Sequence, residues 1–515
     1  MIVMRVLLFG IDGLAFRVLD PLIARGLLPH FQRICQQGAQ GILKSTMPPM
    51  TPPAWMSIST GLLPAQHGVY DFWEYVQTEQ GPLAQVVTHR KGGKAIWNIL
   101  SEWGKRVIVA NVPLTYPPEP VNGIMLSGYM APDTHANITY PTRFKDELLQ
   151  EVPDYQIDLD PAVSGGQIGD PLAETLKMTR SRLAMFRLLL KKPWDFCFLA
   201  CSGADRIQHL CWDEIMAFHP QAVAYYQMLD TALGMMLAEL GPDDLLMIIS
   251  DHGFQGVRRK FYIQEHLYRQ GWLQMRDTSK RRRAEILGMA RKIVKVCNLQ
   301  QPLRRLRSQL RRSGVLAVEK EQHRAHLPEL DWLRTDAWVP SASGFLAGYA
   351  DIFLDKSLTE EEIQLLTDAL CALRDPETGA SLFLEAHRES VYGSGPFAPA
   401  ERHLILLANE DTTLPTELGR GALWETSDVT SGIHHPDGVL YLYGNCIKPG
   451  ARIAPAHVCD IVPTILSFMD VPTPDGLTGK CVQSAFIRPL TRVSSAPASE
   501  GIVKQKLKKL LSESR

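Results

Sequence analysis

Short apolar runs bounded by glycine, aspartate or proline alternate along the chain with longer amphipathic stretches. We interpret six runs as buried strands of a parallel sheet, at residues 5–11, 106–112, 194–200, 245–250, 404–408 and 439–443. Apolar residues recur at helical spacing in five other segments, at residues 94–103, 172–191, 221–240, 359–373 and 461–469. The alternation of strand and helix predicts an α/β fold whose ligands gather at the carboxyl ends of the strands.

The overall composition is that of a globular protein. Of the 515 residues, 45% are hydrophobic and 21% are charged, which argues against a disordered or fibrous chain. The formal net charge of -1 provides no overall attraction to nucleic acid or to an anionic membrane. No window of 18 residues is apolar and free of proline and charge, so the sequence predicts no membrane-spanning helix.

The cysteines and the first residues of the chain bear on its compartment. The nine cysteines include no C-x-x-C pair and mostly lie in apolar runs, which favours buried free thiols in a reducing environment. The apolar run at residues 6–11 is too short for a secretory signal peptide. We therefore expect a soluble, cytoplasmic protein.

One segment differs sharply in charge from the rest of the chain. Residues 276–327 carry 15 Lys or Arg against 4 Asp or Glu, on a mostly helical pattern. We interpret this segment as a basic helical insertion that acts as a cap or a partner surface. The alternatives are a solvated helical face and a surface for an anionic substrate, nucleic acid or membrane.

This segment sets the expected domain organisation. Residues 1–275 and 328–490 are expected to form one catalytic α/β domain, with 276–327 inserted into it. Residues 491–515 are expected to form a C-terminal tail, whose basic stretch at 503–511 is a second candidate for contact with a membrane surface.

Acidic residues follow three of the most apolar predicted strands. Asp12 follows the first, Asp205 follows the strand at 194–200, and Asp251 and His252 follow the strand at 245–250. A carboxylate at the end of a buried strand is costly unless it is compensated, and a divalent cation compensates it directly. His209 lies four residues after Asp205, so the two share one face if a helical turn begins there.

Two further segments add candidates. The adjacent His434 and His435 lie in a glycine-flanked stretch before the strand at 439–443, which we interpret as a loop. Thr51 lies among four prolines and precedes a predicted helix at 54–61, whose N-terminus would attract an anion. A metal ion lowers the pKa of such a hydroxyl and makes it a nucleophile.

Each of these residues has a structural explanation when taken alone, because a strand-end aspartate is often a helix cap and a histidine is often a core or surface group. Their recurrence at three strand ends favours metal binding instead. Aspartate and histidine without cysteine suit zinc or another first-row divalent ion, and the number of ligands suits two ions better than one.

These motifs resemble the alkaline phosphatase superfamily, and in particular its type I phosphodiesterase/nucleotide pyrophosphatase branch. The match is nearest to bacterial proteins described as predicted phosphohydrolases or phosphomutases. The elements that carry the resemblance appear in family order: FGIDGL at 9–14, PPMTPPAWMSISTG at 48–61, residues 104–133, ADRIQH at 204–209, SDHGF at 250–254, RDPETG at 374–379, SGIHHPDG at 431–438 and residues 460–479. The resemblance implies a three-layer α/β sandwich with a mostly parallel central sheet.

The resemblance also implies a site with two divalent metal ions, Zn²⁺ in the first place and Mn²⁺ as the alternative. One ion would be surrounded by Asp12, Thr51, Asp251 and His252, and the other by Asp205, His209 and His434. His434 is preferred to His435 because the family pattern reads Gly-x-His. Thr51 falls where these enzymes carry the residue that attacks phosphorus and is transiently phosphorylated.

The chain departs from the family pattern at one position. Many nucleotide pyrophosphatases carry an asparagine three residues after the nucleophile, where this chain has Ala54. Arg206, His89 and Arg90 are our candidates for contacting the substrate anion in its place, with a surface ion pair as the alternative for each. No Cys/Ser-x-Pro-x-Arg segment is present, which disfavours a sulfatase.

We therefore expect a metal-dependent phosphoesterase that acts on a small phosphorylated substrate. It would hydrolyse a phosphodiester, a nucleotide pyrophosphate or a phosphomonoester through a phosphothreonine intermediate. The alternatives are a phosphotransferase or phosphomutase that uses the same two metals, a non-catalytic metal-binding protein that has kept the fold, and a nucleic-acid-binding protein that acts through residues 276–327.

Overall fold

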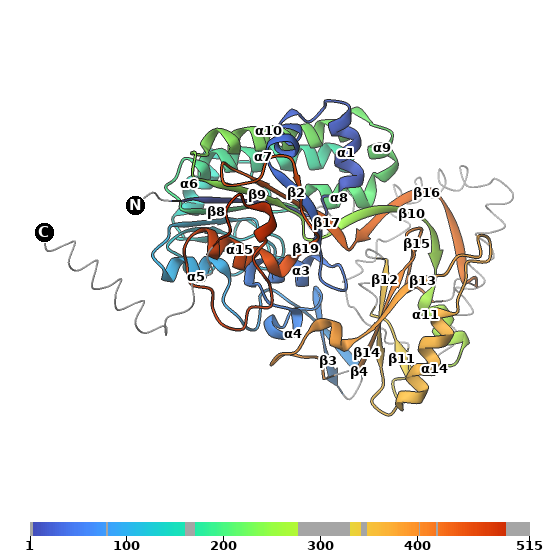
Figure 1. Ribbon diagram of the computed structural model, residues 1–515. Helices are drawn as coiled ribbons and strands as arrows, with labels where there is room; N and C mark the ends of the chain where they lie inside the picture. The colour runs from blue at the N-terminus through green and yellow to red at the C-terminus, as the bar shows by residue number, and fades with distance from the viewer. Residues whose placement is uncertain are drawn as a thin grey trace, which may run out of the picture.

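The computed structural model describes residues 4–78, 81–159, 170–276, 330–340, 348–400, 402–418 and 421–490. The largest element is a ten-stranded main sheet (Figure 1). In spatial order its strands are β18 (Ala451–Arg452), β2 (Ala39–Lys44), β17 (Asp437–Tyr443), β9 (Leu245–Ile249), β1 (Val6–Ile11), β8 (Phe196–Cys201), β5 (Val107–Ala110), β6 (Gly123–Leu126) and β7 (Thr139–Tyr140), and β19 (Ala456–His457) also pairs with β2.

The centre of this sheet is parallel, as the sequence predicts. Strands β9, β1, β8, β5 and β6 all run in the same direction. Strand β1 is buried on both faces, with Leu7 and Phe9 in one core and Val6 and Leu8 in the other. Because neither face meets water, such strands are apolar at consecutive positions. This explains why β1, β5, β8 and β9 begin and end within two residues of their predicted limits.

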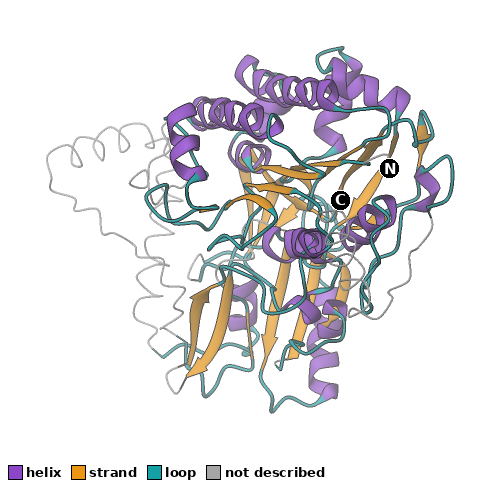
Figure 2. Ribbon diagram, turned by 90° about the vertical axis from the view of Figure 1, so that its left-hand side faces the viewer, coloured by secondary structure: helices purple, strands orange, loops and turns teal. Residues whose placement is uncertain are grey.

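Helices cover both faces of the main sheet and complete the predicted three-layer sandwich (Figure 2). One face is covered by α1 (Phe16–Ala24), α2 (Pro29–Gln37), α6 (Phe144–Glu151), α7 (Pro171–Leu190), α8 (Gly203–Leu210), α9 (Trp212–Met216) and α10 (Pro220–Glu239). The other is covered by α3 (Thr51–Thr60), α5 (Ile96–Glu102) and α15 (Ile461–Phe468). Of the five predicted helices among them, α5, α7, α10 and α15 lie within two residues of their expected bounds, whereas α3 begins three residues before its predicted start and so includes Thr51.

Beside the main sheet lies a second sheet with its own core (Figure 1). Its strands are β11 (Ala337–Trp338), β12 (Tyr349–Leu354), β14 (Arg402–Ala408) and β13 (Phe383–Arg388), and its helices are α11 (Ile263–Arg269) and the predicted α14 (Glu360–Cys371). The three strands β15 (Thr412–Thr413), β10 (Gly253–Phe261) and β16 (Trp424–His435) form a further sheet. A hairpin of β3 (Trp73–Thr78) and β4 (Gly81–Val86) follows the short helix α4 (Pro64–His67).

Two of the six predicted strands are not parallel, so that part of the prediction is wrong. β17 belongs to the main sheet but runs antiparallel to both β2 and β9. β14 belongs to the second sheet and is antiparallel to its neighbours. Leu404 and Leu406 in β14 face one core and Ile405 faces another. An antiparallel strand that is covered on both faces therefore has the same unbroken apolar pattern as a parallel one.

Most of the predicted basic insertion, residues 277–327, and all of the predicted tail at 491–515 lie outside the described residues. On either side of the insertion, Met275 and Leu330 form an antiparallel bridge. In the described part of the chain, no helix is both long enough and apolar enough to cross a membrane.

Candidate metal centre

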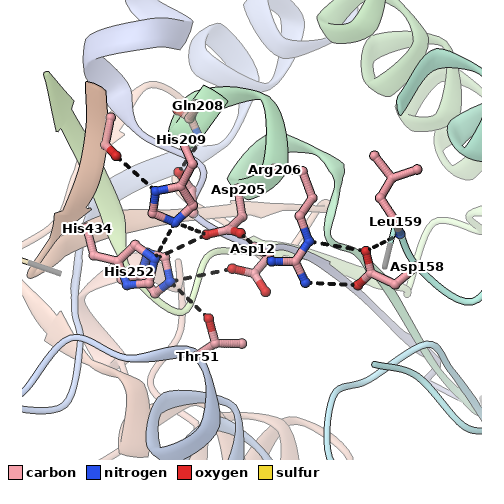
Figure 3. A network of polar contacts seen from close by, with 12 residues as sticks. Asp12, Thr51, Asp158, Leu159, Asp205, Arg206, Gln208, His209, His252 and His434 are labelled. Atoms are coloured by element: carbon pink, nitrogen blue, oxygen red, sulfur yellow. Dashed lines mark hydrogen bonds and ion pairs between the residues drawn. The ribbon is translucent and has the colours of Figure 1, made fainter. Parts of the chain in front are cut away.

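Seven side chains singled out by the sequence lie in one cluster beside the ends of the central strands. Figure 3 labels all of them except Asp251. Asp12 follows β1, and Asp251 and His252 lie between β9 and β10. The remaining members come from three separate elements: Thr51 from α3, Asp205 and His209 from α8, and His434 from β16. The cluster thus joins residues that are far apart in the sequence.

The local sequence places Thr51 at the start of a helix. Pro52 and Pro53 occupy the first turn of α3, where a missing N–H costs nothing because it would have no partner within the helix. The side chain of Thr51 is buried, and its Oγ1 lies 3.3 Å from Nε2 of His252. The positive end of the helix dipole therefore lies beside the candidate nucleophile and favours an anion there.

The first group of candidate ligands is formed by Asp12, Asp251 and His252. Nε2 of His252 lies 3.5 Å from Oδ1 of Asp12 and 3.3 Å from Oδ2 of Asp251. One ligand atom from each of the three residues lies within 4.8 Å of the others, and all three side chains are buried. This spacing suits a single metal ion.

The second group is built around Asp205. Its Oδ1 lies 3.3 Å from Nε2 of His209 and 3.2 Å from Nε2 of His434. The two histidine nitrogens are 3.0 Å apart. The rings of His434 and His252 are stacked with their centroids 3.7 Å apart, and Asp205, His252 and His434 also form a compact group of possible ligands. His252 therefore lies between the two groups.

Main-chain carbonyl groups orient all three histidine rings. Nδ1 of His209 lies 2.9 Å from the carbonyl oxygen of Gly432, Nδ1 of His434 lies 2.9 Å from that of Pro49, and Nδ1 of His252 lies 3.1 Å from that of Gly253. Because a carbonyl only accepts, each Nδ1 carries the proton and each Nε2 presents a lone pair to the cluster. This arrangement is typical of metal-binding histidines.

The carboxylates supply the opposite half of a metal site. Oδ1 of Asp12, Oδ1 of Asp205 and Oδ2 of Asp251 are buried and accept no hydrogen bond from any described residue. Three unpaired oxygens that face three imidazole lone pairs repel one another, and a divalent cation removes that repulsion. The set of oxygen and nitrogen donors therefore fits divalent metal ions, and zinc is bound by such donors.

The pKa values of these residues reflect the same lack of compensating positive charge. Burial, and then the charges of Asp251 and Asp205, raise the pKa of Asp12 well above its usual value, and burial likewise raises that of Asp251. Burial lowers the pKa of His252 and of His434, which keeps both rings neutral and able to bind metal.

The three predicted anion contacts lie in different places. Arg206 borders the cluster, with Nη1 3.0 Å from Oδ2 of Asp205 and Nη2 3.2 Å from Oδ2 of Asp158 (Figure 3). Arg90 forms an ion pair with Glu119 and a hydrogen bond to Asn98, and these contacts do not involve the cluster. His89 is exposed, and its Nδ1 lies 3.0 Å from the hydroxyl of Thr88. Among the three, only Arg206 contacts a candidate metal ligand in the described structure.

Adjacent His434 and His435 lie at the end of strand β16, so their prediction as a loop is wrong. Phe254 in β10 is the cross-strand partner of His434. Successive side chains of a strand point to opposite faces, which separates the two histidines. Nδ1 of His435 accepts a hydrogen bond from the backbone N–H of Asp437, at 3.1 Å.

Two residues that contact the cluster, and one that contacts Arg206 beside it, were not predicted. Trp55 donates a hydrogen bond from Nε1 to Oδ2 of Asp12, at 3.3 Å, and the N–H of Gly13 donates to Oδ1 of Asp251, at 3.1 Å. Gly13 has a φ of 69° and leaves no room for a side chain beside Phe254. Asp158 binds Arg206. The glycine after Asp12 was a visible signal, whereas the segment around Asp158 has no distinctive pattern.

Comparisons with known proteins identify a family and a fold. Residues 6–329 match the family described as type I phosphodiesterase/nucleotide pyrophosphatase. None of the curated proteins matches the sequence at a significant level. Phosphonoacetate hydrolase from Sinorhizobium meliloti 1021, solved with phosphonoformate, is similar in structure with a TM-score of 0.55 and 16% identity, over 89% of this chain and 94% of that one.

A second solved structure leads to the same fold. Murine ectonucleotide pyrophosphatase/phosphodiesterase 5, as an inactive variant in complex with AMP, has a TM-score of 0.50 and 12% identity, over 96% of this chain and 97% of that one. At these identities the likeness concerns the fold, which is the alkaline-phosphatase-like α/β sandwich expected from the sequence.

Proposed function

Since the chain belongs to the type I phosphodiesterase/nucleotide pyrophosphatase family of the alkaline phosphatase superfamily, and is thus a metal-dependent phosphoester hydrolase, we propose that Thr51 is its nucleophile. The observation that supports this role is the position of its hydroxyl. Oγ1 of Thr51 lies at the N-terminus of α3 and 3.3 Å from Nε2 of His252, the residue between the two ligand groups. The site therefore combines a nucleophile with an environment that favours an anion.

The seven residues divide between two metal ions in this proposal. Asp12, Asp251 and His252, with Thr51 beside them, would hold one ion, and Asp205, His209 and His434 would hold the other. Bound ions would lower the pKa of the Thr51 hydroxyl and offset the negative charge on the phosphoryl and leaving oxygens. Zn²⁺ is the first choice because the site offers only imidazole and carboxylate donors, and Mn²⁺ is the alternative.

The proposed reaction has two displacements at phosphorus. Oγ of Thr51 loses its proton and forms a bond to phosphorus while the bond from phosphorus to the leaving oxygen breaks, and the leaving oxygen takes up a proton. This gives an alcohol or phosphate and a phosphothreonine that still carries the second ester group when the substrate is a diester or nucleotide pyrophosphate. Water then attacks the phosphothreonine, the bond between phosphorus and Oγ breaks, and the hydroxyl is restored. Two in-line displacements retain the configuration at phosphorus.

Arg206 is proposed to hold a non-bridging oxygen of the substrate, in place of the asparagine that the chain lacks at Ala54. Its guanidinium is the cation that contacts Asp205, and it is held on its other side by Asp158. The proposed substrate is a phosphodiester, a nucleotide pyrophosphate or a phosphomonoester. We also propose a reducing, cytoplasmic location, because all eight cysteines in the described part of the chain are free.

The nucleophile can be tested by trapping. Wild-type protein loaded with Zn²⁺ and quenched in acid during turnover of bis(4-nitrophenyl) phosphate is expected to carry a 4-nitrophenyl phosphoryl group on the peptide that contains Thr51. Thr51→Ala should keep its metal but lose the adduct and several orders of magnitude of turnover, whereas Thr51→Ser should keep part of the activity. Mass spectrometry, metal analysis and initial rates measure these three properties.

Thr60→Ala is the matched control, because Thr60 lies in the same helix and its hydroxyl donates to the carbonyl oxygen of Met56, at 2.7 Å, away from the cluster. It should form the adduct and turn over at close to the wild-type rate. Near wild-type turnover by Thr51→Ala with full metal content would show that water attacks the substrate directly.

A further inference from the structure

A cavity of about 270 Å³ lies between the β3–β4 hairpin and the second sheet, apart from the seven-residue cluster. Its lining includes Tyr70, Asp71 and Tyr75 on the hairpin side and Asp351 and Phe353 from β12. Tyr349, which also lines it, packs in one hydrophobic cluster with Met50, the residue before Thr51. The proposed mechanism makes no use of this cavity.

Six of the seventeen residues that line the cavity are Phe, Tyr or Trp. The rings of Tyr75 and Phe353 have centroids 5.7 Å apart, and those of Phe353 and His403 are 4.4 Å apart. Tyr70 contacts Tyr392 edge-on, at 4.9 Å. Aromatic faces carry partial negative charge, so a cage of such rings attracts organic cations.

Two of the three carboxylates that line the cavity already have strong partners. Asp351 accepts hydrogen bonds from the hydroxyl of Tyr392 and from Nδ1 of His403, each at 2.8 Å. Glu74 forms an ion pair with Lys91. These two carboxylates are therefore satisfied by the protein itself.

Asp71 differs from them because no cation pairs with it among the described residues. It accepts only the backbone N–H of Phe72, at 2.6 Å. Beside it, the hydroxyl of Tyr75 is buried and has no hydrogen-bond partner in the described part of the chain. The aromatic cavity thus contains one unpaired carboxylate and one unpaired hydroxyl, which together call for a positively charged donor.

We propose that this cavity binds an alkylammonium group. Its positive charge would lie against Asp71 and contact the hydroxyl of Tyr75, and its carbon atoms would pack against the aromatic rings. A metal ion does not fit as well, because it would need several oxygen ligands where the walls offer rings. The ammonium group could belong to a free amine or to the head group of a phosphodiester. In the second case the inference rests on the proposed function.

The titration of Asp71 makes cation binding depend on pH. Burial, with a further contribution from Asp351, raises the pKa of the Asp71 carboxyl to about 7. The other charged or titratable groups that line the cavity are Glu74, Tyr75, Lys91, Tyr349, Asp351, His403 and Tyr70. A cation binds the ionised carboxylate, so the affinity for a permanently charged ligand should increase as the pH rises through 7.

Calorimetry tests the site directly, with choline chloride and ethylammonium chloride as probes and sodium chloride as the reference salt. The wild-type protein at pH 8 should bind at least one probe saturably. Asp71→Asn should weaken that binding by roughly tenfold or more, and Tyr75→Phe should weaken it less. Glu74→Gln is the matched control, because Glu74 lines the same cavity but is paired with Lys91; it should bind within about twofold of wild type.

Absence of saturable binding, or equal losses in Asp71→Asn and Glu74→Gln, would overturn the proposal. Thr51→Ala should bind the probes like the wild type, so a failed catalytic mechanism and a failed ammonium site give different results. Tyr75→Phe provides a second measurement if Asp71→Asn does not fold.

Kinetics then distinguishes the two sources of the ammonium group. If it belongs to the substrate, Asp71→Asn should raise KM for 4-nitrophenyl phosphorylcholine but leave bis(4-nitrophenyl) phosphate unchanged. If the ammonium group belongs to a free amine, choline should bind in calorimetry. In that case Asp71→Asn should leave the ratio of kcat/KM for 4-nitrophenyl phosphorylcholine to that for bis(4-nitrophenyl) phosphate unchanged. Either result, together with the calorimetry, supports the site.

Discussion

The metal centre and the aromatic cavity both concentrate negative charge, but they are built in different ways. In the candidate metal centre, three histidines are oriented by backbone carbonyls, and three carboxylate oxygens accept no hydrogen bond from the described residues. In the cavity, aromatic side chains lie beside Asp71, the one lining carboxylate that has no cationic or side-chain partner among the described residues. Rigid lone pairs that converge on a point select a small divalent ion, whereas rings around one charge select a larger, organic cation.

The largest effect is expected when one carboxylate is removed from the candidate metal centre. Asp251→Asn keeps Oδ1, which accepts from the N–H of Gly13, and replaces only Oδ2, which faces His252. Substitution of residues that merely support ligands costs about 10–100-fold, so loss of a ligand should reduce kcat/KM by more than about 100-fold. Metal analysis and rates with bis(4-nitrophenyl) phosphate measure the effect.

Asp71→Asn makes the same chemical change in the cavity and is the control for this experiment. It should retain its metal and its activity on that ester. If Asp251→Asn still bound two metal ions and turned over at the wild-type rate, Asp251 would not be a metal ligand.

A smaller effect is expected when a group that supports a ligand is changed. Trp55→Phe removes the hydrogen bond to Oδ2 of Asp12 and should weaken metal binding by about tenfold, at the lower end of the range for such partners. Competition with a chromogenic chelator measures the affinity. Trp97→Phe is matched to it, because Trp97 is buried in the same core and its Nε1 donates to Glu119 instead; its metal affinity should be unchanged.

Removal of the metal should also lower thermal stability. A ligand that binds only the native state at 100 times its Kd stabilises that state by about 2.7 kcal/mol, so chelation should reduce Tm by a few degrees. Calorimetry before and after chelation, and again after zinc is restored, measures the shift. An identical Tm in all three samples would mean that the buried carboxylates are compensated by something other than metal.

The smallest expected effect concerns the pH dependence of stability and belongs to the cavity. Because the folded-state pKa of Asp71 is raised to about 7, the native state holds this proton more tightly than the unfolded state. The contribution of Asp71 to stability is therefore fully present below the unfolded pKa of about 4 and is lost as the pH rises through 7. Asp71→Asn should flatten the fall in Tm between pH 5 and pH 8. A profile parallel to that of the wild type would contradict the raised pKa.

The sequence predicts the centre of the fold well because burial on both faces leaves a clear trace. Strand β1 ends at Ile11, and Asp12 follows directly, so strand and candidate ligand are visible together. The direction of β17 leaves no such trace, since antiparallel pairing gives it the same apolar pattern. The contact between Trp55 and Asp12 depends on how α3 packs on the sheet, which the spacing of residues does not specify.

The cavity could not be predicted from the sequence for the same reason. Asp71 and Asp351 come from separate segments that are brought together by the hairpin and the second sheet. Each aromatic residue in its wall looks like an ordinary core residue when it is taken alone. What distinguishes the site is the absence of a cationic partner for Asp71 in the described structure, and this is a property of the folded arrangement.

The position of β17 in the sequence determines when the main sheet can be completed during synthesis. Among the described strands, β2 pairs only with β17, β18 and β19, and β17 also covers the edge of β9. His434 precedes β17 closely and lies 225 positions after His209. A ribosome that adds ~5–20 residues per second needs roughly 10–45 s for that interval. Once β9 has been made, and until β17 follows, the nascent chain has an open apolar edge at β9 and lacks only His434 of the seven candidate residues. Completion of the sheet and of the candidate metal centre therefore both await the return of the chain.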